Sequence, residues 1–336
     1  MRDSFVKTLI DIAKKDKNVH LITGDLGFGV LKPYWEQLPE QFTNAGIAEQ
    51  NMTGIAAGMA LSGKIVFTYS IGNFPTLRCL EQIRNDCAYH EANVKIVCIG
   101  GGFVYGSLGM SHHATEDIAI MRALPSVVVT APGDSVEAEA LTYAIYKHPG
   151  TCYLRLGRGG EKKIHDKITD FEIGKAIKII DGENIVFFST GGIFDETSGA
   201  IELLNRLGIY PALYTFPTIK PIDQEVIKEC SQKYNLIVTV EEHTIVGGFG
   251  SAVAEVLSGI YFPKAVQIRI GLNDTYSGIV GSQQYLRHKY GMSSKKIVER
   301  ILQFYFMDSA ISLEKITIEK KRVERRRIRQ RVRFDR

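Results

Sequence analysis

The 336-residue chain has no run of about 18 apolar residues, which is the length that a transmembrane helix requires. Its first twenty residues, "MRDSFVKTLIDIAKKDKNVH", are charged throughout and lack the apolar stretch of a secretory signal. The five cysteines form no CxxC pair, and their odd number leaves one unpaired. These absences argue against a membrane protein, a zinc ribbon and a disulfide-stapled secreted protein. They predict a cytoplasmic protein with reduced thiols.

The sequence also lacks a dinucleotide fingerprint. The stretch "GDLGFG" follows a strand-like run, but its glycine spacing differs from that of the fingerprint and "VLKPYW" after it is not a clear helix. A nicotinamide-dependent dehydrogenase is therefore the weakest of the enzymatic interpretations.

The positive net charge belongs to the last residues alone. Residues 319–336 hold ten Lys or Arg and three acids, a balance of +7, so residues 1–318 carry −3 of the total of +4. Such a tail could bind nucleic acid non-specifically, but no aromatic pattern or recognition fold accompanies it. A solvated basic tail over 307–336 is the expectation, and a nucleic-acid function is disfavoured.

Short β-branched runs alternate with helical patterns along most of the chain. Alternating strands and helices predict an α/β fold, in which mainly parallel sheets are covered by helices on both faces. The pattern pauses at the charged, Gly-rich stretch "RLGRGGEKKIHDKITDFEIGK". We expect two three-layer domains over 1–160 and 176–306, joined by a linker over 161–175. The expected strands are "VHLITGD", "KIVFTYS", "VKIVCIG", "SVVVTAP", "NIVFFST", "ALYTF", "LIVTVEE" and "AVQIRIG".

Four motifs occur in an order that is typical of one enzyme family. They are "GIAEQNMTGIAAG", "YSIGNFPTLRCLEQIRND", "GSLGMSHHATEDIAIMRALPSVVVTAPGD" and "EEHTIVGGFGSAVAE". Together they resemble the C-terminal half of transketolases and the matching part of 1-deoxyxylulose-5-phosphate synthases. The resemblance covers residues 1 to about 305. It implies a thiamine pyrimidine-binding domain followed by a transketolase C-terminal domain.

Glu49 stands where a helix of small and apolar residues begins. Acids are favoured in a first helical turn, so the residue alone needs no functional explanation. The resemblance implies more: a glutamate at this position binds the pyrimidine ring of thiamine diphosphate and favours the tautomer that serves as base. Such a carboxylate needs a dry, close-fitting pocket. Gly54, Ala57 and Gly58 are expected to let the helix pack closely around it.

Two adjacent histidines follow in the Gly-rich third motif. Adjacent side chains diverge and no third ligand has suitable spacing, so a metal site is disfavoured. The resemblance implies that His112 handles protons on sugar hydroxyls near the reacting carbon, work that suits the pKa of imidazole. His113 is its neighbour, and is expected to contribute to substrate binding.

The resemblance also implies the rest of the site. Phe74 is the aromatic residue available to stack on the pyrimidine ring, and Arg78 matches an arginine near the cofactor. Asp25 matches an aspartate that lines the thiamine site, although a turn at a strand end explains it equally well. Arg158 and Arg2 match arginines that hold a sugar phosphate, for which a guanidinium is well shaped.

The chain departs from the family pattern in two ways. It contains no GDG, the start of the GDG…N motif that binds the cofactor diphosphate through Mg²⁺. The resemblance therefore implies an N-terminal partner subunit that carries this motif, and we expect an α2β2 assembly in which this chain also pairs with itself. Leu108 stands where transketolases have an aspartate. The family pattern also has a histidine earlier in this segment, but the matching stretch here is "IGGG", which contains none. Because both would touch sugar hydroxyls, the usual sugar substrates are in question.

The sequence favours a transketolase-like transferase that moves a two-carbon ketol unit from a ketose phosphate to an aldehyde. Two other enzymatic interpretations remain open. One is the β subunit of a 2-oxo acid dehydrogenase, which shares the domain pair and the glutamate. The other is an acyloin synthase similar to 1-deoxyxylulose-5-phosphate synthase.

Overall fold

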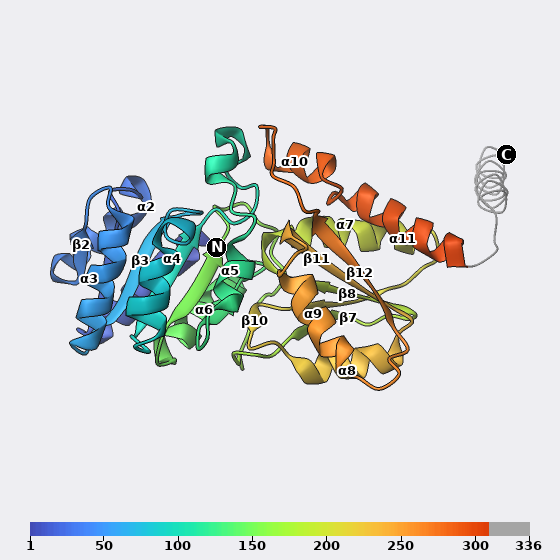
Figure 1. The fold of residues 1–336 in the computed structure, drawn as a ribbon, viewed down its shortest axis with the longest axis horizontal. Helices are drawn as coiled ribbons and strands as arrows, with labels where there is room; N and C mark the ends of the chain where they lie inside the picture. The colour runs from blue at the N-terminus through green and yellow to red at the C-terminus, as the bar shows by residue number, and fades with distance from the viewer. Residues whose placement is uncertain (309–336) are drawn as a thin grey trace, which may run out of the picture.

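The computed structural model describes residues 1–308, and side chains through residue 304 (Figure 1). The N-terminal half forms a sheet with helices on both faces. Its strands are β1 (Val19–Thr23), β2 (Phe42–Asn44), β3 (Ile65–Ile71), β4 (Val94–Ile99), β5 (Val128–Thr130) and β6 (Cys152–Leu156). Its helices are α1 (Arg2–Lys15), α2 (Phe28–Gln37), α3 (Glu49–Leu61), α4 (Leu80–Gln82), α5 (Asp117–Ala123) and α6 (Ser135–Lys147).

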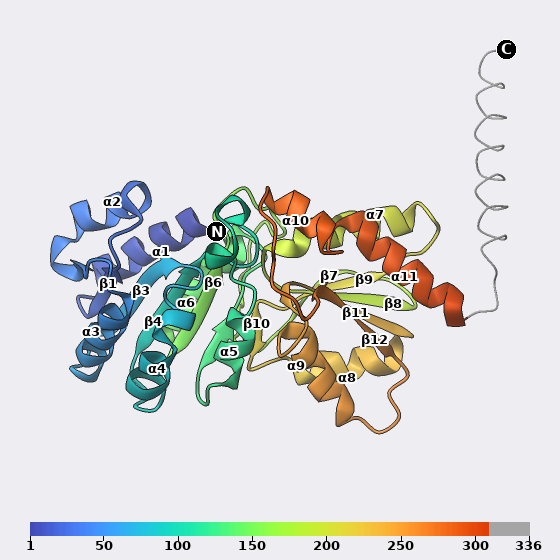
Figure 2. The same ribbon diagram turned by 45° about the horizontal axis from the view of Figure 1, so that its top comes forward.

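The C-terminal half forms a second sheet of five strands. Its elements are β7 (Ile177–Ile180), β8 (Ile185–Ser189), α7 (Phe194–Asn205), β9 (Ala212–Thr215), β10 (Thr218–Lys220), α8 (Gln224–Lys233), β11 (Leu236–Thr244), α9 (Phe249–Ser258), β12 (Val266–Leu272), α10 (Gln283–Lys289) and α11 (Ser294–Asp308). The strand order is β12-β11-β8-β9-β7, with β7 alone antiparallel. In Figure 2, α7 and α11 cover one face and α8 and α9 cover the other.

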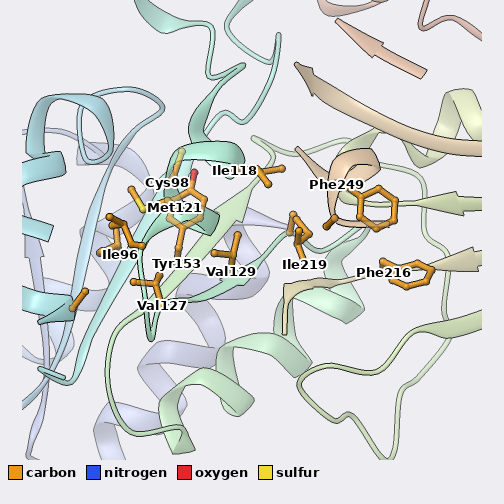
Figure 3. Close-up of a cluster of buried hydrophobic side chains, with 14 of the residues drawn as sticks. Ile96, Cys98, Ile118, Met121, Val127, Val129, Tyr153, Phe216, Ile219 and Phe249 are labelled. Atoms are coloured by element: carbon orange, nitrogen blue, oxygen red, sulfur yellow. The ribbon is translucent and has the colours of Figure 1, made fainter. Parts of the chain in front are cut away.

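Strand β10 belongs to the C-terminal half in sequence but forms an edge strand of the first sheet. That sheet has seven strands in the order β10-β5-β6-β4-β3-β1-β2, all parallel except β10, which pairs antiparallel with β5. Buried side chains continue across this junction, as Figure 3 shows from Ile96 and Tyr153 to Ile219, Phe216 and Phe249. The two halves therefore share one sheet edge and one apolar core.

The sequence explains why these elements form. Every residue of β1, β4, β6 and β8 is buried, as expected for parallel strands covered on both faces. Helix α6 begins at Asp134, whose carboxylate accepts hydrogen bonds from the backbone N–H groups of Val136 and Glu137. The expected α/β class with mainly parallel sheets is confirmed.

Several local features differ from the expectation. The apolar spacing of "PTLRCLEQIRNDCAYH" predicts one helix, but residues 77–88 form a 3₁₀ turn, one α-helical turn and a π-helix in succession. Strands β2, β6, β7 and β10 were not expected. In α3, Ala57 is buried, but Gly54 and Gly58 are exposed and nothing lies within 4 Å of where their Cβ atoms would be. Within the described residues, Ala57 therefore contributes to close packing of α3, whereas Gly54 and Gly58 do not.

Nearly all of the basic tail expected over 307–336 lies outside the described residues. Within 1–308, no helix is long and apolar enough to cross a membrane.

Candidate active site

The predicted site residues follow the carboxyl ends of neighbouring parallel strands. Glu49 packs against the end of β1, Phe74 and Arg78 follow β3, His112 follows β4 and Arg158 follows β6. Strands β6, β4, β3 and β1 are adjacent in the first sheet. Ligands of open α/β sheets bind at this edge. The fold thus brings these residues together at the carboxyl ends of the strands of the first sheet.

Glu49 is the first residue of α3 and is only 3% exposed. Its Cγ lies close to the backbone of Gly24, where a Cβ atom would be 3.4 Å away. A buried carboxylate needs a compensating partner. Arg78 supplies one, because its Nη1 donates a hydrogen bond of 2.6 Å to Oε2 of Glu49.

Phe74 connects this ion pair to the loop histidine. The Arg78 guanidinium carbon lies 4.5 Å from the centre of the Phe74 ring, within range of a cation–π interaction. The Phe74 ring also packs against the His112 ring at a centroid distance of 5.2 Å, with the two ring planes at 71°. His112 is half-buried, and its Nδ1 lies 3.0 Å from the hydroxyl of Ser111.

A pocket of about 310 Å³ opens beside these side chains. Its walls combine apolar groups with hydroxyl, amide and charged groups, as in many ligand sites. Glu49 is not part of the wall, and Arg78 stands between it and the pocket. The lining residues are Asn73, Phe74, Leu77, Arg78, Met110, Ser111, His113, Thr115, Glu116, Tyr276 and Ser277.

His113 has a different environment from His112. It is 1% exposed, its Nε2 lies 3.1 Å from the carbonyl oxygen of Gly106, and its Nδ1 makes a short hydrogen bond with the hydroxyl of Ser277. Burial lowers the pKa of His113. Because both ring nitrogens are occupied, the structure assigns His113 to holding the loop against the C-terminal half. His113 also lines the pocket, so its contribution to substrate binding stays a prediction.

The remaining predicted residues lie around this centre. Asp25 is exposed with a φ of 55°, and its carboxylate accepts a hydrogen bond from the amide of Asn44, as in a turn. It does not line the pocket.

Arg158 is exposed, with its guanidinium carbon 5.8 Å from the ring centre of Tyr105. Arg2 pairs with Asp3, and its charge partly opposes the rise that burial causes in the pKa of the Tyr105 phenol.

Sequence reasoning missed a buried ionic network beneath the site. Asp117 accepts hydrogen bonds from the Tyr153 hydroxyl and from Nε of Arg155, and Arg155 also donates to the carbonyl oxygens of Ala114 and Glu242. This network fixes the end of the loop that carries His112. A lone arginine inside the apolar run "CYLRL" was the available signal, since buried charges need partners.

Glu242 fixes the other end of that loop. Its carboxylate accepts hydrogen bonds from the backbone N–H of Phe103, from Gln283 and from Arg287. Beside it, the ring of His243 is fully buried and its Nε2 accepts a hydrogen bond from the N–H of Ile118. Burial lowers the pKa of His243 to about 4. The loop thus rests on a rigid base contributed by β11.

Two family models match the sequence. Residues 1–160 match the transketolase pyrimidine binding domain, and residues 174–297 match the transketolase C-terminal domain.

Similar proteins match most of the chain. A Methanocaldococcus jannaschii protein, whose name describes a transketolase C-terminal section, is 40% identical over 306 residues, with 90% of this chain and 95% of the relative covered. One of the subunits of the apulose-4-phosphate transketolase of Phocaeicola vulgatus is 35% identical, with 90% and 96% covered. A solved structure described as a split gene transketolase, inactive beta4 tetramer, superimposes on this chain with a TM-score of 0.82 at 32% sequence identity. The match covers 90% of this chain and 97% of the chain in that structure. With these matches over nearly its whole described length, the chain belongs to the transketolase family.

Proposed function

We propose that this chain is the C-terminal subunit of a thiamine diphosphate-dependent enzyme that transfers a two-carbon ketol unit from a ketose phosphate to an aldehyde. The observation that carries the proposal is the placement of Glu49, which is buried at the start of α3 and joined through Arg78 to a pocket lined by Phe74. Membership of the transketolase family supports the proposal that thiamine diphosphate is the cofactor, because that family depends on it.

The residues at this edge fit the aminopyrimidine end of the cofactor. A pocket of about 310 Å³ with a flat aromatic wall suits a heterocycle, and a buried carboxylate suits a hydrogen bond to a ring nitrogen. When bound, the cofactor would supply a carbanion nucleophile for ketol transfer. In the proposal Glu49 holds the pyrimidine nitrogen, Phe74 packs against the ring, and water is excluded by the surrounding apolar side chains.

His112 is proposed to move protons on substrate hydroxyls. Its ring lies against Phe74 and, within the described residues, its only side-chain hydrogen bond is to Ser111. The other ring nitrogen is therefore available to exchange a hydrogen bond with a substrate hydroxyl. Arg158 and Arg2, which both lie near Tyr105, are proposed to hold the phosphate of the sugar.

An N-terminal partner subunit is part of the proposal. The sequence contains no GDG, and the names of similar proteins describe a subunit, a section and a split gene product. We propose that the partner carries the GDG…N motif and binds the diphosphate through Mg²⁺, and that two copies of each chain form the active α2β2 assembly.

Reconstitution of both subunits tests this function. The two chains are purified separately and together, and thiamine diphosphate and Mg²⁺ are titrated into each sample by calorimetry. Tight cofactor binding is expected only for the pair, with turnover of a ketose phosphate and an aldehyde. If the pair turns over a 2-oxo acid with an electron acceptor instead, the dehydrogenase interpretation is correct. If it condenses pyruvate with an aldehyde phosphate, the acyloin synthase interpretation is correct.

A further inference from the structure

Tyr105 fills a space that a glycine leaves open at the end of β4. Gly100 has a φ of 92°, and a Cβ atom built on it would overlap Cδ2 and Cε2 of the Tyr105 ring. Any larger residue at position 100 would therefore displace the ring. Close packing against bare backbone fixes the ring at one place, because a well-packed side chain has few alternative positions.

The position of Tyr105 is between two residues of the proposed site. Its ring centre is 6.4 Å from that of His112, which approaches edge-on, and 5.8 Å from the guanidinium carbon of Arg158. His112 in turn contacts Phe74. These contacts form a row in the sense that each side chain touches the next: Glu49, Arg78, Phe74, His112, Tyr105 and Arg158.

The phenol of Tyr105 is available to a ligand. It makes no hydrogen bond to any side chain or backbone group within residues 1–304, and the residue is only half-buried. Burial raises the pKa of the phenol, and the nearby Arg158 and Arg2 partly oppose this shift. At neutral pH the group is a protonated hydroxyl that can both donate and accept a hydrogen bond.

We propose that Tyr105 is a specificity-determining residue that recognises the middle of a phosphorylated sugar. This inference rests on the proposed function. The row places the reacting carbon near His112 and the phosphate near Arg158, so the carbons between them pass Tyr105. Its hydroxyl donates a hydrogen bond to a sugar hydroxyl or phosphate oxygen there. A short donor without a phosphate does not reach Tyr105 and gains nothing from it.

Tyr105→Phe tests this inference because the ring that fills the space beside Gly100 is kept. The assembled pair with thiamine diphosphate and Mg²⁺ is compared on two donors, a ketose phosphate and the three-carbon donor hydroxypyruvate. For the ketose phosphate, kcat/KM should fall about tenfold, mainly through KM, as expected for one lost hydrogen bond. For hydroxypyruvate it should not change. Tyr143→Phe, on α6 and away from the site, is the matched control.

A binding measurement keeps the inference testable without turnover. Sorbitol 6-phosphate, a polyol phosphate without a carbonyl group, is titrated into the same assemblies by calorimetry, and the Kd should rise about tenfold in Tyr105→Phe. An unchanged Kd, or equal losses on both donors, overturns the inference. A parent pair that binds sorbitol 6-phosphate through Tyr105 but transfers no ketol unit overturns the proposed function and leaves Tyr105 as a sugar phosphate ligand.

Discussion

Arg78 and Glu49 form an ion pair in which the arginine is also part of the pocket wall. Nη1 of Arg78 lies 2.6 Å from Oε2 of Glu49, and the arginine side chain is 46% exposed while that of Glu49 is 3% exposed. The buried acid is thus connected to the pocket through a partly exposed cation. A ligand that reaches Glu49 must pass the guanidinium or share the carboxylate with it.

Glu49→Gln should abolish most of the turnover of the assembled pair. The amide keeps the size of the side chain but cannot act as an anionic hydrogen-bond acceptor for the pyrimidine ring. We expect a fall in kcat of at least about 100-fold, measured with saturating cofactor, at unchanged secondary structure. Glu36→Gln, on the exposed side of α2, is the control. Turnover equal to that of the parent would remove Glu49 from the mechanism.

Arg78→Gln should destabilise the chain only modestly, because the guanidinium is partly exposed and solvent screens the pair. We expect a loss of about 1 kcal/mol in the free energy of unfolding, measured with urea. In the Glu49→Gln background the same change should cost less, since the buried charge is already gone. Equal costs in both backgrounds would mean that the two side chains are not energetically coupled.

The two adjacent histidines should respond differently to substitution by asparagine. His112→Asn should lower kcat about 100-fold without changing Tm, because the half-buried His112 is the proposed proton-transfer group and its one side-chain hydrogen bond among the described residues is to the exposed Ser111. His113→Asn should lower the free energy of unfolding by about 2 kcal/mol, because two buried hydrogen bonds are lost. Thermal unfolding and steady-state kinetics of both variants check this. The opposite pattern would exchange the two roles.

Glu242→Gln should loosen the loop that carries His112. Arg287 would remain buried without its carboxylate, which costs about 3 kcal/mol. Faster amide hydrogen exchange is expected over residues 103–115, together with a lower kcat. Glu255→Gln, an exposed partner of Arg122, is the control. Unchanged exchange in the loop would show that Glu242 does not position it.

His243 should make stability fall as pH falls. Burial lowers its pKa from 6.5 to about 4, so the unfolded chain takes up a proton below pH 6.5 before the folded chain does. Relative to His243→Gln, the parent should lose about 2 kcal/mol between pH 7.5 and pH 5.

The comparison with this variant is necessary because Glu241 acts in the opposite direction. Burial raises the pKa of Glu241 to about 7, so its contribution is lost as pH rises from 4.5 to 7. Asp117 and Arg155 also face the ring of His243, and all three charged groups are present in both proteins. The difference between the two unfolding curves therefore isolates His243. A difference that does not vary with pH would contradict the prediction.

The sequence predicted the α/β class because buried parallel strands leave unbroken apolar runs such as "VKIVCIG". It also proposed Glu49, Phe74 and His112 from motifs that resemble one family, and the structure places these residues close together after strand ends. Strand β10 could not be predicted, since three residues carry too little pattern and their partner is about 90 positions away.

Other features depend on packing between distant segments. His113 is engaged by Ser277, which lies 164 residues away in the sequence, so nothing local distinguishes it from His112. Tyr105 occupies the space beside Gly100 only because the loop folds back onto β4. The exposed Gly54 and Gly58 could not be told from buried ones, because small residues suit a close contact on either face of α3.

The β10 strand limits how the molecule can move. A protein with two lobes usually opens and closes by rotating one lobe about a linker. Here such a rotation would tear β10 from β5 and break the shared apolar core. We therefore expect the two halves to move as one body, and any opening that admits a ligand to be confined to short loops beside the pocket.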